Sequence, residues 1–258
     1  MFFFAQNACL VLGFWGVCVI LRYKLNRMAN NFFSFRQFTV RQDGCAMKVG
    51  TDGTLLGAWA EGGKRVLDIG TGTGLIALMM AQRFPDASVT AIDIDSGACR
   101  QAEQNVAESP FAHRITVVNS SVQDFRRGEY DAIVCNPPFF VDSLGCPDSR
   151  RHIARHSSAL SFPELFGAVG RLLCSGGVFS AVVPVECLSL FDSCAAMEGF
   201  RCVRRCAVKT VPRKPARRFL VAYSMSSSLP CIEEEGCIED GSGRRSAWYS
   251  QLTAEFYL

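Results

Sequence analysis

One rigid polar segment, Asn-Pro-Pro-Phe at residues 136–139, combines groups that can do chemistry on a flat amino group. Its two prolines remove two backbone donors and stiffen the chain, which leaves the side-chain oxygen of Asn136 and the carbonyl of Pro137 as fixed acceptors. Two acceptors of this kind can hold an NH2 group. Phe139 can stack on a flat acceptor, worth roughly 1 to 3 kcal/mol for a base on an aromatic ring. The segment therefore predicts a catalytic site for a planar, amide-like or aromatic amino nitrogen.

A glycine turn precedes this segment in the chain. Residues 66–74 are Val-Leu-Asp-Ile-Gly-Thr-Gly-Thr-Gly, so Gly70, Gly72 and Gly74 follow a short apolar run. Glycine is favoured where the backbone must approach a ligand closely. A dinucleotide fingerprint would need a glycine at Leu75, and the Gly-Lys-Ser/Thr of a phosphate-binding P-loop is absent too. The turn therefore favours a nucleoside-type cofactor, S-adenosylmethionine, although such turns also serve as plain strand-to-helix connections.

Acidic residues complete the predicted cofactor site. Asp93 ends the second predicted strand, where its carboxylate can accept the ribose hydroxyls of S-adenosylmethionine, and Asp68 lies beside the glycine turn. Asp124 follows the third strand and can contact the adenine amino group. The competing interpretations are that Asp93 begins a helix and that Asp124 caps a short turn. An amine held at Asn136 would then attack the sulfonium methyl in line.

The apolar pattern alternates between strand-like and helix-like segments. The predicted strands are residues 65–69, 88–92, 115–119, 131–135, 178–183, 202–211 and 218–224, and the predicted helices are 75–82, 97–108, 162–173 and 186–197. Ser161 and Glu164 have capping-box spacing at the start of the third helix. Repeated strand–helix units build a parallel sheet, whose carboxyl edge holds ligands. We expect an α/β, Rossmann-like fold: a mostly parallel seven-stranded sheet with a closing antiparallel pair and helices on both faces.

Length and composition indicate one domain. The 258 residues are 49% hydrophobic and carry a formal charge of +3, too little to identify a nucleic-acid binder without clustering. The cysteine count of 13 is odd and no Cys-x-x-Cys occurs, so we expect reduced thiols in the cytoplasm. Cys202 with Cys206, and His152 with His156, are each four residues apart, but no metal site is expected.

The ends of the chain differ from its centre. Residues 1–27 form an apolar leader, either a membrane anchor followed by basic residues that keep the domain cytoplasmic, or an artefact if translation begins at Met28. Residues 28–258 form the predicted single domain. Within it, residues 226–243 are predicted to be an acidic, solvated loop, and residues 248–258 a tail that packs back.

The motif at residues 136–139 resembles that of the N6-adenine and glutamine-N5 branch of class I methyltransferases, and the match extends over residues 36–223. More narrowly, residues 35–59 and the closing residues 249–258 resemble the bacterial tRNA1(Val) adenine-37 N6-methyltransferases. The resemblance implies methylation of adenosine 37 in a tRNA substrate. It also places the segment around residues 48–54, with Lys48 and Thr51, beside the methionine portion of the cofactor. The competing interpretation of this segment is an N-terminal packing helix.

Two basic segments fit an RNA substrate. Residues 201–218 contain eight lysines or arginines and no acid, and a second basic segment follows the catalytic motif. Neutralised phosphates release counterions, so such contacts weaken with salt. The acidic residues 233–235 are expected to face elsewhere. The predicted RNA-binding residues are Arg150, Arg151, Arg155, Lys209, Arg213, Lys214, Arg217 and Arg218.

Two other functions remain open from the sequence. Methylation of a glutamine amide in a protein such as a release factor uses similar geometry, but those enzymes carry a helical N-terminal domain for which residues before the glycine turn are too few. A non-catalytic RNA-binding protein on a methyltransferase fold is the second alternative. The intact Asp93 and Asn136 argue against it.

Overall fold

The computed structural model divides the chain into two units, Met1–Asn30 and Asn31–Leu258. It describes residues 31–43, 48–137, 160–226 and 230–258, all in the second unit. The predicted leader, residues 1–27, lies outside these ranges. Within the described ranges, none of the helices has the length and apolar character needed to cross a membrane.

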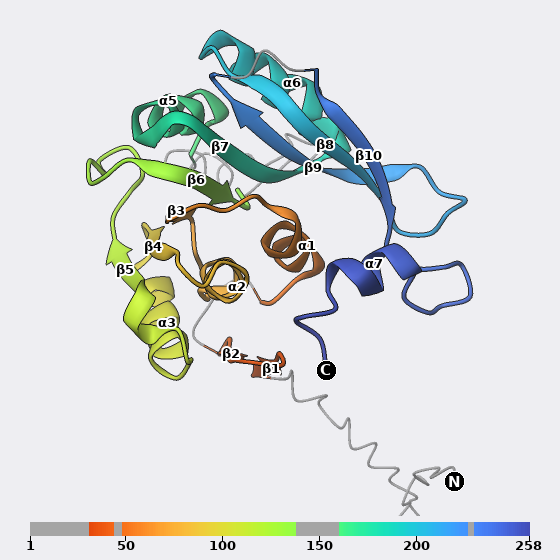
Figure 1. The fold of residues 1–258 in the computed structure, drawn as a ribbon, viewed down its shortest axis with the longest axis horizontal. Helices are drawn as coiled ribbons and strands as arrows, with labels where there is room; N and C mark the ends of the chain where they lie inside the picture. The colour runs from red at the N-terminus through yellow and green to blue at the C-terminus, as the bar shows by residue number, and fades with distance from the viewer. Residues whose placement is uncertain (1–30, 44–47, 138–159, 227–229) are drawn as a thin grey trace, which may run out of the picture. The chain divides into compact units, whose positions relative to one another are not determined.

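A large sheet forms the centre of the domain, with the strand order β10-β8-β9-β7-β6-β3-β4-β5 (Figure 1). Its strands are β3 (Arg65–Ile69), β4 (Ser88–Asp93), β5 (Ile115–Asn119), β6 (Tyr130–Cys135), β7 (Leu173–Pro184), β8 (Arg201–Lys209), β9 (Ala216–Ser224) and β10 (Ile232–Cys237). Strand β9 is antiparallel to both of its neighbours, and every other pair is parallel. All strands except β9 therefore end at the same edge of the sheet.

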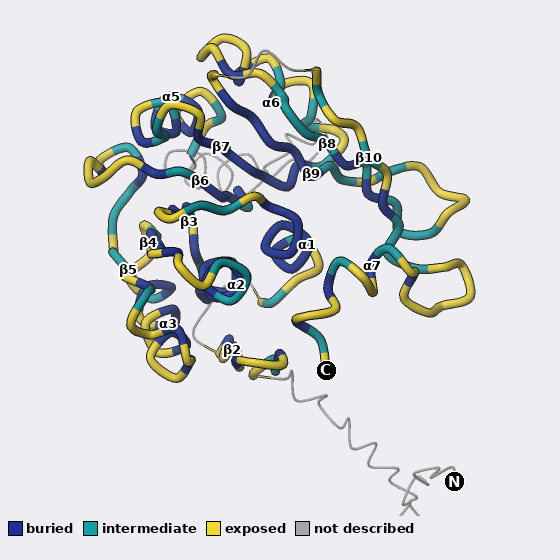
Figure 2. Tube along the Cα trace, in the orientation of Figure 1, coloured by how far each residue is buried: buried dark blue, intermediate teal, exposed yellow. Residues whose placement is uncertain are grey.

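Helices cover both faces of this sheet. They are α1 (Thr51–Trp59), α2 (Leu75–Arg83), α3 (Ser96–Ala107), α5 (Phe162–Leu172), α6 (Val185–Met197) and α7 (Ala247–Leu252), with a short hairpin of β1 (Phe32–Ser34) and β2 (Thr39–Arg41) before α1. One apolar cluster joins α1, α2, the hairpin and the C-terminal tail to the sheet, and a second joins α5 and α6 to the other face. Figure 2 shows that the central strands are largely buried and that α1 and α2 are largely buried with them.

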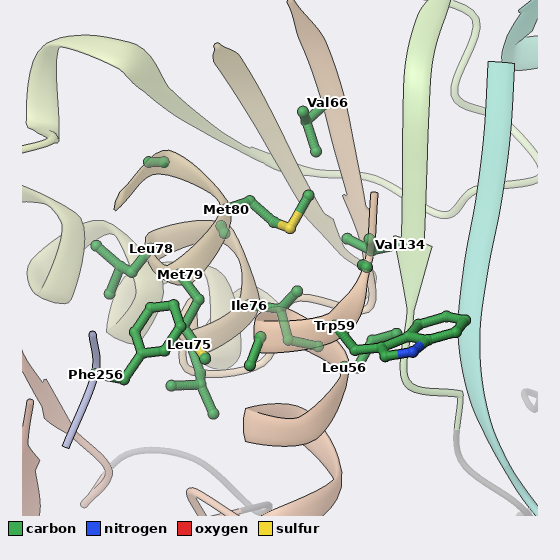
Figure 3. Close-up of a cluster of buried hydrophobic side chains, with 14 of the residues drawn as sticks. Leu56, Trp59, Val66, Leu75, Ile76, Leu78, Met79, Met80, Val134 and Phe256 are labelled. Carbon is green, nitrogen blue, oxygen red and sulfur yellow. The ribbon is translucent and has the colours of Figure 1, made fainter. Parts of the chain in front are cut away.

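The close packing of α1 on α2 explains two glycines in α1. A Cβ at Gly57 would lie 2.7 Å from the sulfur of Met79, and one at Gly53 would lie 3.2 Å from Leu75 Cδ2. Figure 3 shows Leu75 and Met79 in the same cluster as Leu56. Because no larger side chain fits at Gly57 without movement, glycine allows the two helices to approach. The first turn of α1 is thereby held against the residue that follows the glycine turn.

The α/β fold predicted from the sequence is confirmed, with each predicted strand and helix present to within a few residues. The capping box also forms: Ser161 Oγ accepts from the backbone of Glu164, whose carboxylate accepts from Ser161 N at 2.9 Å. The helix ends earlier than predicted, because Leu173 already belongs to β7. The hairpin was not predicted, and α1 corresponds to the packing helix that was the competing interpretation of residues 48–54.

An eighth strand corrects the predicted seven. Strand β10 lies within residues 226–243, which the sequence indicated to be a solvated acidic loop. It pairs in parallel with β8, so the acidic residues face the basic segment instead of pointing elsewhere. The carboxylate of Glu234 accepts from Trp59 Nε1 at 3.0 Å and from Arg204 at 3.1 Å, and Glu235 pairs with Lys209 at 2.7 Å. Cross-strand neutralisation therefore allows three consecutive acids to form a strand.

Candidate active site

The register of the sheet brings three predicted site residues to one edge. Ile69 of β3 lies opposite Ile92 of β4 and Cys135 of β6. The next residues along these strands are Gly70, Asp93 and Asn136. Neighbouring strands are about 4.8 Å apart, so Asp93 and Asn136 flank the glycine turn within about 10 Å of each other. The predicted cofactor and catalytic residues thus meet at the carboxyl edge of the sheet.

The three glycines of the turn have different surroundings. All adopt positive φ, at 70° for Gly70, 55° for Gly72 and 82° for Gly74. A Cβ added at Gly70 or Gly72 would meet nothing within 4 Å, whereas one at Gly74 would lie 3.4 Å from Ala102 Cβ. The backbone at Gly70 and Gly72 therefore faces open space, where a ligand can approach it. Gly74 instead packs against α3.

Asp93 joins the glycine turn to the end of β4. Its Oδ2 accepts from Gly72 N and its Oδ1 accepts from Asp95 N, both at 2.9 Å. Asp95, not Asp93, caps α3, because its side chain accepts from Gly97 N at 2.7 Å. Asp93 is thus half-buried at the strand end, beside the turn, and the helix-capping interpretation applies to its neighbour.

Asp68 is fully buried beneath the turn. Its Oδ2 accepts from Thr71 Oγ1 at 2.6 Å and from Ala77 N at 3.1 Å, while Oδ1 is buried with no hydrogen-bond partner among the described residues. Burial raises the pKa of Asp68 to about 7. An unpartnered buried carboxylate oxygen next to open glycines fits a ligand that carries a cationic amino group. The amino-acid portion of S-adenosylmethionine has such a group, so these residues fit the cofactor.

Lys48 and Thr51 lie at the start of α1. Both are exposed, and Gly53 in the same helical turn contacts Leu75, which follows Gly74. Asp52, which follows Thr51 in the first turn of α1, forms an ion pair with Arg218 of β9. This ion pair and the packing on α2 hold the start of α1 near the glycine turn.

The remaining predicted site residues divide into described and undescribed ones. Asn136 is half-buried and Pro137 is buried. Asp124 is exposed and accepts from Ser121 Oγ at 2.7 Å within a turn. That contact matches its turn-capping interpretation, and its role toward adenine stays a prediction. Predicted residues outside the described ranges are Phe139, Arg150, Arg151 and Arg155.

The sequence did not single out three side chains at this edge, and two of them hold it together. Asn119 Nδ2, at the end of β5, donates to the carbonyls of Asp93 and Ile94 at 2.9 and 3.1 Å. The buried Asn105 of α3 donates to the carbonyl of Thr73 at 2.8 Å. Ile94 is 66% exposed beside Asp93, where an apolar side chain suits the flat face of an adenine. Ile94 could have been found from the sequence, because it is a large apolar residue directly after the acid that ends the strand.

The basic segment of residues 201–218 is partly neutralised. Lys209 and Arg218 each have an acidic partner, Glu235 and Asp52. Three exposed basic residues have no acidic partner within the described part of the chain: Arg213 and Lys214 in the turn between β8 and β9, and Arg217 at the start of β9. Phosphate binding by all five stays a prediction, and these three are its strongest candidates.

Over residues 31–43, 48–137, 160–226 and 230–258, no group of three or more His, Cys, Asp or Glu side chains is placed to hold a metal ion. Cys206 is buried and Cys202 half-buried, and the Cys202 thiol lies 3.3 Å from that of Cys231. His152 and His156 lie outside the described residues.

Comparisons with known proteins agree with this geometry. Residues 51–158 match the family model for the methyltransferase small domain. The fold resembles that of a predicted O-methyltransferase from Agrobacterium tumefaciens, with a TM-score of 0.64 and 18% identity over 80% of this chain and 96% of that one. It also resembles a ribosomal protein L11 methylase from Lactobacillus delbrueckii subsp. bulgaricus, with a TM-score of 0.51 and 19% identity over 72% and 84% of the two chains. These two likenesses show the fold.

Curated relatives are considerably more similar in sequence. A protein from Bacteroides thetaiotaomicron is 46% identical over 235 residues, which cover 90% of this chain and 99% of the relative. One from Aeromonas hydrophila is 44% identical over 232 residues, covering 89% and 98%. Both are named tRNA1(Val) (adenine(37)-N6)-methyltransferase. At this identity and coverage, the chain belongs to the tRNA1(Val) (adenine(37)-N6)-methyltransferase family.

Proposed function

We propose that this protein transfers a methyl group from S-adenosylmethionine to the N6 amino group of adenosine 37 in tRNA1(Val), in the cytoplasm. The observation that carries the proposal is the placement of Asn136 and Pro137 beside an open glycine turn at the carboxyl edge of the sheet. The relatives that share 44–47% identity with the chain carry the corresponding name. The cofactor and the substrate would thus meet where three strands end.

The chemistry required of the protein is activation of a poor nucleophile. The lone pair of an exocyclic adenine nitrogen is delocalised into the ring, and acceptors that draw on both hydrogens favour the form in which it is localised. Asn136 Oδ1 and the Pro137 carbonyl are the acceptors. When bound, S-adenosylmethionine supplies an electrophilic methyl group on its sulfonium. Attack of the nitrogen would form a bond to that carbon as the carbon–sulfur bond breaks, which would release S-adenosylhomocysteine, and the methylated amine would give one N–H proton to water.

The cofactor contacts follow from the open and unsatisfied groups. The backbone at Gly70 and Gly72 would lie along the amino-acid portion, with Asp68 Oδ1 available to accept from its ammonium group. Asp93, at the end of β4, would accept the ribose hydroxyls, and Ile94 would contact one face of the adenine. Further cofactor contacts are proposed for Lys48, Thr51, Gly74 and Asp124.

A labelling experiment tests this proposal. The purified protein is incubated with methyl-labelled S-adenosylmethionine and either unmodified tRNA1(Val) or a release factor, and the methylated residue is mapped by mass spectrometry. We expect label on N6 of adenosine 37 and none in protein. Label only in a protein glutamine would replace the proposal with amide methylation, and label in neither substrate would support the non-catalytic alternative.

A further inference from the structure

Two turns lie together at the edge of the sheet that carries Asn136. The first, residues 210–217, follows β8 and includes the first two residues of β9, and the second, residues 239–245, follows β10. Because β8 and β10 are parallel to each other and to β6 and β7, both strands end at the edge where β6 ends. The turns are exposed (Figure 2). They therefore lie at the same edge of the sheet as the catalytic segment, on the β10 side of β7.

Direct contacts join the two turns. Backbone pairing continues past the strands, with Glu239 N donating to the carbonyl of Thr210 at 2.9 Å. A Cβ at Gly241, where φ is 91°, would lie 3.8 Å from Pro212. The second turn is held by Asp240, which accepts from the backbone and hydroxyl of Ser242, both at 2.7 Å. The two turns thus form one surface with a defined backbone.

This surface is positively charged. Its basic residues are Arg213, Lys214, Arg217, Arg244 and Arg245, and its acidic residues are Glu239 and Asp240, giving a net formal charge of +3. The Arg244 side chain is 82% exposed and lies 3.6 Å from Asp240, whose carboxylate is already bound to the turn. Arg245 lies over the ring of Tyr257 with its centre 4.0 Å away, which fixes the position of its guanidinium. Exposed cations on a built turn are typical of phosphate contacts.

The position of this surface relative to Asn136 indicates what it would contact. Strand β8 is three strands away from β6, and β10 is four away. At about 4.8 Å per strand, the basic turns lie roughly 14 to 19 Å along the edge from the catalytic segment. This separation is too large for contact with the methylated base and suits backbone phosphates farther along a folded RNA.

We propose that residues 210–217 and 239–245 form a single phosphate-binding surface for the tRNA, in which Arg244 is a binding residue alongside Arg213, Lys214 and Arg217. This inference rests on the proposed function and extends it to a second turn. Within the predicted acidic loop at residues 226–243, three acids lie in β10 and two, Glu239 and Asp240, lie in the turn after it. The basic charge of this turn comes from Arg244 and Arg245, which directly follow the predicted loop.

The test compares Arg244→Gln with a triple variant of Arg213, Lys214 and Arg217 to glutamine. The matched control is Arg127→Gln, because Arg127 is also exposed but precedes β6, at the opposite edge of the sheet. Affinity for unmodified tRNA1(Val) is measured by fluorescence anisotropy at several salt concentrations, together with kcat, KM for tRNA and affinity for S-adenosylmethionine.

For Arg244→Gln we expect a several-fold loss of tRNA affinity, a matching rise in KM with kcat unchanged, and a salt slope smaller by about 1. The triple variant should lower the slope by up to about 3, and the control should change none of these values. Unchanged cofactor affinity in every variant verifies the fold. If wild-type protein methylates tRNA but Arg244→Gln binds it with the wild-type salt slope, the turn at residues 239–245 does not bind tRNA phosphates, and the proposed function is unaffected. If wild-type protein does not methylate tRNA, the function itself fails.

Discussion

Two regions of the sheet differ in how their polar groups are paired. Around the glycine turn at β3 and β4, groups remain open: Asp68 Oδ1 is buried without a partner among the described residues, and two glycines face open space. Between β8 and β10, oppositely charged side chains pair with one another. The ion pairs there join Arg204 to Glu234 and Lys209 to Glu235. Polar groups without partners indicate a place where a ligand can supply the missing contacts, whereas paired charges indicate contacts that the chain supplies by itself.

The largest expected effect is at Asn136. In Asn136→Ala, one of the two acceptors for the target amine is lost, so methyl transfer should be abolished while affinity for S-adenosylmethionine stays within a few-fold. Asn136→Asp is the matched variant and should keep measurable turnover, because a carboxylate also accepts the amine hydrogens. Turnover on unmodified tRNA and calorimetric cofactor binding give both quantities. Near-normal turnover in Asn136→Ala would remove this residue from the reaction.

The glycine turn offers a direct comparison of an open and a packed position. Gly72→Ala and Gly74→Ala both place a Cβ on a left-handed residue, a strain of roughly 1–2 kcal/mol. The Gly72 Cβ projects into open space, so we expect an additional loss of cofactor affinity, tenfold or more if it costs about 1.4 kcal/mol of binding. At Gly74 the Cβ meets Ala102, and the loss should be mainly thermal stability.

Melting temperature and cofactor affinity, measured on both variants, separate these effects. Equal losses of cofactor affinity would mean that the open space at Gly72 is not where the cofactor lies. A loss confined to Gly74→Ala would move the cofactor contact toward α3.

Asp68 should make stability and cofactor binding depend on pH. Its pKa is about 7 in the folded protein, against an ordinary value of 3.8, so the folded state holds a proton that the unfolded state has released. The contribution of Asp68 to stability therefore falls as pH rises from about 4 to about 7. A cationic amino group near Oδ1 would favour the charged form, so affinity for S-adenosylmethionine should rise over the upper part of this range.

The matched variant is Asp68→Asn, which removes the titration and keeps the shape. Unfolding free energies of both proteins are measured by urea denaturation from pH 4 to 8. As pH rises, the wild type should lose stability relative to the variant, so the difference between the two proteins should shrink as pH falls. Cofactor affinity of the variant should be flat with pH. A parallel pH dependence in both proteins would assign the effect to another group.

Local signals explain what the sequence predicted correctly. The turn at Gly70 to Gly74, the capping box at Ser161 and the strand-ending Asp93 depend on neighbours within a few residues, and each appears in the structure. The parallel sheet then follows from repeated strand–helix units. The same reasoning placed Asn136 at the carboxyl edge, because a strand end is a local feature.

The features that were missed depend on distant partners. Strand β10 forms because Glu234 meets Trp59 and Arg204, which are separated from it by 175 and 30 residues. The same holds for Asn105, whose side chain joins α3 to the backbone of Arg41 and Thr73. Helix α1 was only the competing interpretation of residues 48–54, because its two packing glycines lower helix propensity; tertiary contact with α2 outweighs that cost. None of these partners can be assigned from a single sequence.

The smallest expected effect concerns the paired charges between β8 and β10. Glu234→Gln removes the charge that pairs with Arg204, which also lies over the Trp59 ring with its guanidinium carbon 4.3 Å from the ring centre. Because these side chains are partly exposed, we expect a loss of about 1 to 2 kcal/mol in unfolding free energy. Glu233→Gln, at an exposed neighbour in the same strand, should change it by less than about 0.5 kcal/mol.

Hydrogen exchange locates the effect. Amides of β10 should exchange faster in Glu234→Gln and at the wild-type rate in Glu233→Gln, with kcat unchanged in both. Equal destabilisation by the two substitutions would mean that β10 is held by its backbone pairing with β8 alone. The ion pairs would then form because the strand is already in place. The failure to predict β10 from the sequence would then have a cause other than its distant charged partners.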